Sequence, residues 1–166
     1  MKEPRVRIYQ YVNRPYGAVR ELLRLRPEEL FQRATTSAAA RASAVAASLH
    51  AGVGGVDVGI DVRIHVQAVR DDAGVAGMSP VTHVDLAWEA LRAPALFPVM
   101  KAQLSFWPLT ASETQLEIEG AYRPPMGVVG NVVDAAVGHR IAEAAVHRFL
   151  DDVVEQLRRE LPEGKT

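Results

Sequence analysis

Residues 56–68 read VDVGIDVRIHVQA, and an apolar side chain stands at every even position over these thirteen residues. Polar residues or glycine occupy the odd positions between them. Successive side chains of a β-strand point to opposite faces, so this period of two predicts a long, half-buried strand. One face of the strand is expected to meet a hydrophobic core and the other to meet water.

The same alternation returns in three later segments, residues 82–90, 100–106 and 114–122. Their inward-facing residues again stand at even positions: Thr82, Val84, Leu86, Trp88, Ala90, Met100, Ala102, Leu104, Phe106, Thr114, Leu116, Ile118 and Tyr122. A loop over residues 71–80 separates the first two strands, and Pro98 and Pro108 bracket the third. Antiparallel pairs whose residue numbers sum to an even value place all four rows on one face. The pattern therefore predicts an antiparallel meander.

One strand and two helices are expected before the meander. Residues 5–12 alternate apolar and polar side chains and are rich in β-branched and aromatic residues, which predicts a strand. Pro15 suits the first turn of a helix, and Pro27 ends that helix near residue 26 and begins another. The second helix has acidic residues in its first turn and runs through alanine-rich sequence to about His50.

A single long amphipathic helix is expected at the C-terminus. Asn131 and Asp134 have the spacing of a capping pair, and they open a helix of about 30 residues. Its apolar stripe, at 100° per residue, consists of Ala135, His139, Ala142, Val146, Phe149, Leu150, Val153 and Leu157. The inner face of the sheet is the only large apolar surface left for this stripe to cover.

Composition narrows the function classes. A chain of 166 residues and 18.1 kDa predicts one domain over residues 1–166. The absence of cysteine excludes thiol catalysis, disulfides and cysteine metal sites. A net charge of −1 gives no electrostatic reason to expect nucleic acid or an anionic membrane as partner. We expect a cytoplasmic protein, because the N-terminus lacks a signal-peptide pattern and no apolar run is long enough to span a membrane.

This element order resembles the helix-grip fold of the START-like (SRPBCC) superfamily, which includes plant pathogenesis-related allergens, lipid-transfer START domains and aromatic polyketide cyclases. The resemblance covers about residues 5–160, and the stretch from FPV at 97–99 through GAYRPP at 120–125 to His139 is similar to uncharacterised bacterial members. It implies an α+β fold in which a curved antiparallel sheet wraps around the long C-terminal helix. The chain shows five strands where six or seven are usual, unless residues 56–68 break at Gly59.

The resemblance implies that a hydrophobic small molecule, such as a lipid, a polyketide or an aromatic compound, binds between sheet and helix. A curved sheet and a straight helix cannot touch along their whole length, and apolar pockets with few polar groups are the usual small-molecule sites. The candidate ligand-binding residues are Leu86, Trp88, Leu104, Phe106, Ile118, Tyr122, His139, Ala142 and Val146. The alternative interpretation is that these side chains fill a core. No cofactor is expected.

Two other functions remain open. In the first, the chain is an enzyme of cyclase or hydratase type that uses His139 and Tyr122 as proton-transfer groups. In the second, it is a protein-interaction module whose alanine-rich helix at residues 27–50 docks a partner or a second copy, giving a homodimer.

Three further patterns are weaker. If the loop centres on residue 75, His65 faces Asp85 and lies near His83, a combination that can hold iron. These residues belong to the polar face, so we expect no metal site there. Glu117 and Glu119 point outward from the same face and are expected to be solvated. Residues 127–130, GVVG, are expected to form loop structure, and no nucleotide-binding or hydrolase motif is present.

Overall fold

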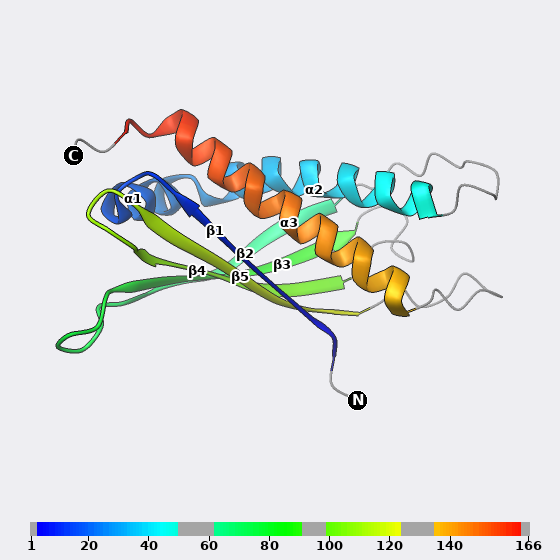
Figure 1. Ribbon diagram of the computed structural model, residues 1–166, viewed down its shortest axis with the longest axis horizontal. Coiled ribbons are helices and arrows are strands. Elements are labelled where there is room, and N and C mark those ends of the chain that lie inside the picture. Colours follow the sequence, from blue (N-terminus) through cyan, green and yellow to red (C-terminus); the bar gives the residue numbers. More distant parts are fainter. Residues whose placement is uncertain (1–2, 50–61, 91–98, 124–134, 164–166) are drawn as a thin grey trace.

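The computed structural model describes residues 3–49, 62–90, 99–123 and 135–163. In chain order the elements are β1 (Arg5–Val12), α1 (Tyr16–Leu25), α2 (Pro27–Leu49), β2 (Val62–Asp72), β3 (Val81–Ala90), β4 (Val99–Pro108), β5 (Thr114–Arg123) and α3 (Ala135–Glu160) (Figure 1). The predicted order of strand, two helices, meander and long helix is therefore confirmed. The predicted cap at Asn131 and Asp134, and any break at Gly59, lie outside the described residues.

The strands form one antiparallel sheet in the order β1-β5-β4-β3-β2. Partners in β3, β4 and β5 have residue numbers with even sums, as in Leu86 opposite Ala102 and Leu104 opposite Ile118. The even-numbered residues of these strands are consequently buried on one face, from Thr82 to Trp88 in β3 and from Met100 to Phe106 in β4. This outcome confirms the expected common face.

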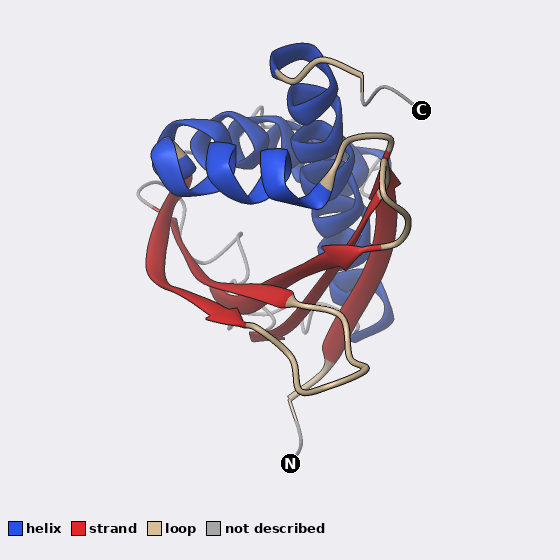
Figure 2. Cartoon of the chain, turned by 90° about the vertical axis from the view of Figure 1, so that its left-hand side faces the viewer, coloured by secondary structure: helices blue, strands red, loops and turns tan. Residues whose placement is uncertain are grey.

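The two helices α2 and α3 cover the concave face of the sheet (Figures 1 and 2). Helix α3 packs against β1, α2 packs against β2, and the two helices pack against each other. The sheet and the helix pair therefore enclose the hydrophobic core between them. No helix in the described part of the chain combines the length and apolar character needed to cross a bilayer.

The edge strand β2 is covered by a side chain of α2. The Gln32 side-chain amide donates to the Val62 carbonyl oxygen at 2.9 Å, and its oxygen accepts from the Ile64 backbone N–H at 3.1 Å. These two bonds reproduce the pairing that a further strand would make. They occupy backbone groups that an open edge would otherwise present to another chain.

The register of β2 differs from the predicted hairpin. A β-bulge between Val66 and Ala68 adds one residue, so Val66 faces Leu86 while Val69 faces Val84. Odd-numbered residues then point inward, and Asp71 comes opposite Thr82. The strand continues to Asp72, so the loop predicted from residue 71 starts too early. The turn that follows contains Gly74 and Gly77, whose φ values of 72° and 89° favour glycine.

Candidate functional site

Tyr122 and His139 meet at one end of the core. Tyr122 lies on the inner face of β5 and is 2% exposed, whereas His139 lies in the first turns of α3 and is exposed. The Tyr122 hydroxyl is 3.0 Å from His139 Nδ1, and the two rings are tilted by 32°. Burial raises the pKa of the Tyr122 phenol, so the hydroxyl stays protonated at neutral pH. The pair links a buried phenol to an imidazole at the surface.

Eight of the nine predicted ligand-binding residues are buried. Six of them, Tyr122 included, lie on the sheet, and two lie on the inward stripe of α3; their exposed fractions are Leu86 1%, Trp88 6%, Leu104 0%, Phe106 0%, Ile118 0%, Tyr122 2%, Ala142 1% and Val146 4%. The structure therefore brings the predicted residues to one interior surface. His139 differs, because it stands at the edge of the stripe and reaches water.

Large aromatic side chains of α2, α3 and β3 pack against one another in the interior. The Phe149 ring of α3 lies edge-on to Trp88, with centroids 5.1 Å apart, and beside Phe31 of α2 at 6.0 Å. Trp88 Nε1 donates to Thr35 Oγ1 of α2 at 3.0 Å, and Thr35 is 1% exposed. Thr35 is not among the site residues predicted from the sequence. The available signal was a lone hydroxyl on the buried stripe of a helix, because such a group needs a hydrogen-bond partner.

The end of the interior near α1 is also filled. Phe106 contacts the Tyr16 ring at a centroid distance of 5.8 Å, and the Tyr16 hydroxyl reaches Thr82 at 2.7 Å. Leu104 and Phe106 contribute no exposed surface. These side chains therefore close the end of the interior near α1.

The grouping of His65, Asp85 and His83 is wrong because the hairpin does not centre on residue 75: Asp72 faces Val81, which puts the centre between residues 76 and 77. His65 faces Ala87 and contacts Glu89, while Asp85 faces Ala68 and accepts from Arg70 at 3.0 Å. His83 Nδ1 lies 2.8 Å from Ser105 Oγ instead. This hairpin centre shifts the partners along β3, so the three side chains enter separate contacts.

The paired glutamates of β5 meet arginines of β1. Glu119 accepts from Arg5 at 2.8 Å and Glu117 accepts from Arg7 at 2.6 Å. These contacts are on the outer face of the sheet, away from the core. The two ion pairs align β1 on β5. Neither Glu117 nor Glu119 faces the interior.

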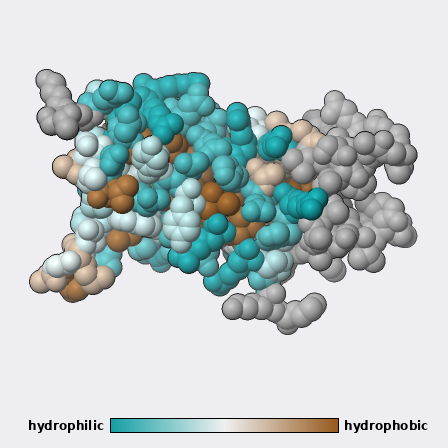
Figure 3. All heavy atoms as spheres, in the orientation of Figure 1, coloured by the Kyte–Doolittle hydropathy of each residue, from teal (hydrophilic) through white to brown (hydrophobic). Residues whose placement is uncertain are grey.

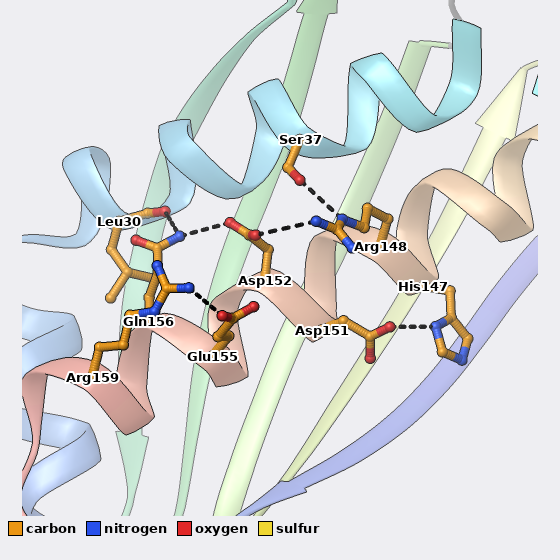
Figure 4. Close-up of polar contacts among 9 residues, drawn as sticks. All are labelled: Leu30, Ser37, His147, Arg148, Asp151, Asp152, Glu155, Gln156 and Arg159. Carbon is orange, nitrogen blue, oxygen red and sulfur yellow. Dashed lines mark hydrogen bonds and ion pairs between the residues drawn. The ribbon is translucent and has the colours of Figure 1, made fainter. Parts of the chain in front are cut away.

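An open groove of about 670 Å³ lies along the outer side of α2 and α3. It is lined by Ser37, Ala40, Arg41, Arg140, Glu143, Ala144, His147, Arg148 and Asp151. Arg148 Nε donates to Ser37 Oγ at 3.0 Å, and His147 Nδ1 lies 2.9 Å from Asp151 (Figure 4). The visible surface over these helices is mostly hydrophilic (Figure 3). This groove does not suit the predicted apolar ligand.

Comparisons with known proteins show a likeness of fold. No protein-family model matches the chain, and no curated protein matches its sequence. The structure of TTHA0849 from Thermus thermophilus is 11% identical, covers 96% of this chain and 100% of its own, and has a TM-score of 0.52. The Zhui aromatase/cyclase from Streptomyces sp. R1128 is 14% identical over 97% of each chain, with a TM-score of 0.47.

A conserved protein from Geobacillus kaustophilus is 8% identical, covers 94% of this chain and 96% of its own, and has a TM-score of 0.49. At these identities the likeness concerns the fold. The element order and the long helix on the concave face of an antiparallel sheet agree with it. The chain therefore has an α+β, helix-grip fold.

Proposed function

We propose that this protein binds a hydrophobic small molecule, such as a lipid, a polyketide or an aromatic compound, between the sheet and α3. The observation that supports this proposal is the Tyr122–His139 hydrogen bond at one end of a mostly apolar interior. Sites for small molecules combine mostly apolar walls with a few placed polar groups. The Tyr122 hydroxyl and the His139 imidazole are such groups.

The packing of the core supports a site at the Tyr122 end. Phe106 fills the end near α1, whereas Trp88 lies in the same row of the sheet as Met100 and Tyr122 and would form a wall of the site. The Tyr122 end has alanine at position 142 of α3, which is 1% exposed. An apolar molecule that enters there meets Tyr122 and Ala142 first.

Binding of the fluorescent probe N-phenyl-1-naphthylamine tests the proposal. We expect a saturable rise in fluorescence with one probe per chain. Ala142→Leu should weaken binding at least several-fold, because it extends a buried side chain into the site. The matched control is Ala144→Leu, the same change at a half-buried position that lines the outer groove, and it should leave the affinity unchanged.

Thermal melts of both variants separate loss of binding from loss of folding. Native mass spectrometry of the purified protein adds an independent readout through co-purified molecules. Failure to detect either probe binding or a bound molecule in the wild-type chain would overturn the proposal.

The hydrogen bond between Tyr122 and His139 also favours a second function, an enzyme of cyclase or hydratase type. Proton exchange between a protonated phenol and an exposed imidazole would connect the interior to solvent. A molecule recovered from the protein decides between the two functions. Conversion of that molecule by the wild-type chain, lost in Tyr122→Phe while binding is kept, would favour the enzyme.

The interaction-module alternative has weaker support. The apolar residues of α2 from Leu30 to Ala42 are buried within the chain, against α3 and β2. They are therefore occupied and do not offer a free docking face. A homodimer, a cytoplasmic location and the absence of a nucleic-acid partner stay predictions.

A further inference from the structure

The interior is lined unevenly from one end to the other. Toward α1, large side chains without exposed surface fill it: Leu104, Phe106, Leu116 and Leu157. Toward Tyr122, four small buried residues of the sheet and of α3 lie beside the large side chains of Trp88, Met100 and Tyr122; the small residues are Ala102, Gly120, Ala142 and Ala145. Met100 is the one unbranched, flexible side chain among these large residues.

Met100 lies across Gly120 on the inner face of the sheet. A Cβ atom at Gly120 would be 2.2 Å from Met100 Cε, closer than real Cβ contacts allow, and 3.0 Å from Ala102 Cβ, a tight contact. Glycine at position 120 therefore leaves room for the Met100 side chain that crosses it. An unusual backbone angle is not the reason for this glycine. Met100 itself is 4% exposed.

The position of Met100 is flanked by aromatic residues. It faces Trp88 on β3 and Tyr122 on β5 in the strand register. Methionine is unbranched and has three rotatable side-chain bonds, so it can change its path without a movement of the backbone. Withdrawal of this side chain would open a space bordered by Trp88, Tyr122, Ala102 and Gly120.

Tyr122 defines the polar edge of that space. A phenolic oxygen carries one proton and can also accept hydrogen bonds, and the contact with His139 uses only one of these capacities. When the Tyr122 hydroxyl donates to His139 Nδ1, its oxygen remains able to accept from a ligand hydroxyl. The fitting ligand is thus a compact aromatic compound with one hydroxyl group.

We propose that Met100 is an internal plug, and that a compact hydroxylated aromatic molecule binds by displacing it from above Gly120. This inference rests on the proposed function and refines it, because it names the side chain that the ligand replaces and the chemical class of the ligand. The trigger for opening is the ligand itself, which favours the conformation with the side chain withdrawn.

The test uses protein labelled with [methyl-¹³C]methionine and titrated with 1-naphthol. The chain has four methionines, and Met78, 68% exposed, serves as the internal reference. The Met100 resonance is assigned by its absence from Met100→Leu. We expect a saturable shift of the Met100 methyl group and no shift of Met78. Naphthalene, which lacks the hydroxyl, should bind more weakly than 1-naphthol.

Affinity measurements provide a second readout. Met100→Ala should bind 1-naphthol about tenfold more tightly if the plug is withdrawn in a tenth of wild-type molecules. Met100→Leu keeps the volume but has a branched, stiffer side chain, and it should weaken binding. Leu104→Ala on the same strand is the control for simple cavity formation, because it removes a fully buried side chain from the filled end.

The outcomes separate this inference from the function on which it rests. Saturable naphthol binding with an unmoved Met100 resonance would overturn the plug and leave the proposed function standing. An equal gain in affinity from Leu104→Ala would also overturn it. Absence of binding of both 1-naphthol and N-phenyl-1-naphthylamine in the wild type and in Met100→Ala would overturn both. If Met100→Ala does not fold, the wild-type titration and Met100→Leu still decide.

Discussion

Arg14 buries its guanidinium group among backbone carbonyl oxygens, and only 5% of the residue is exposed. Its side chain donates to Arg158 O and Leu161 O at 2.7 Å each and to Asn13 O at 2.8 Å. The last carbonyls of a helix lack intrahelical partners and carry the negative end of its dipole. Arg14 therefore caps the C-terminus of α3 and holds it against the end of β1.

Replacement of Arg14 should destabilise the fold. Hydrogen bonds to charged groups contribute roughly 1.5–3 kcal/mol, and several are lost here, so Arg14→Ala should cost about 3 kcal/mol. Arg14→Lys keeps the charge but not the planar donor geometry, and it should cost less. Urea denaturation measures both. Arg26→Ala removes only an exposed ion pair with Glu160 and should cost under about 0.5 kcal/mol; an equal cost for the two alanine variants would contradict this role.

At the scale of elements, Asp71 ties helix α1 to strands β2 and β3. Its carboxylate accepts from Arg20 Nη2 and Arg24 Nη2, each at 2.5 Å, and from Thr82 Oγ1 at 2.8 Å. Because Thr82 donates to Asp71, the Tyr16 hydroxyl must donate to Thr82. The hydrogen bond from Arg20 is the largest cause that lowers the pKa of Asp71, to about 2.

This cluster predicts a loss of stability in acid. The pKa of Asp71 lies below its ordinary value of 3.8, so the folded state favours the carboxylate. The contribution is present above pH 3.8 and is lost as the pH falls toward 2. After screening by solvent it should amount to about 1 kcal/mol. Denaturation curves from pH 6 to about pH 2 should show a smaller decline for Asp71→Asn than for wild type.

The control for this prediction is Glu21→Gln on the exposed side of α1. It should follow the wild-type dependence of stability on pH. A decline in Asp71→Asn as steep as that of the wild type would show that the cluster does not contribute.

At the scale of the whole molecule, the sheet and the helix pair form a closed ring around the core. Each edge strand packs against a helix, β1 against α3 and β2 against α2. The two helices pack against each other and so close the ring (Figure 2). Phe149 lies at the junction, since it contacts Phe31 of α2 and Trp88 of β3. One side chain thus joins three elements that are far apart in the sequence.

Phe149→Ala should lower the free energy of unfolding by about 3–5 kcal/mol, the usual cost of removing a buried aromatic ring. The free energy is measured by chemical denaturation. Leu109→Ala removes a side chain that is 52% exposed and should cost under about 0.5 kcal/mol. A cost below about 1 kcal/mol for Phe149→Ala would show that the ring is not needed to hold the three elements together.

The sequence determined the features that depend on neighbouring residues. The period of two in β3, β4 and β5 follows from local backbone geometry, and so do the helix starts near Pro15 and Pro27. The burial of Leu86, Leu104 and Ile118 follows from the same alternation. Most residues of the inner surface could therefore be predicted from the sequence alone.

Tertiary structure alone decided how these elements meet. The bulge after Val66, the pairing of β1 with β5, and the crossing of Met100 over Gly120 depend on residues distant in the chain. His139 illustrates the difference. The helical periodicity predicts which side of α3 carries His139, whereas its contact with Tyr122 depends on where α3 packs on the sheet. Local patterns specify which face a residue takes, but long-range packing specifies its partner.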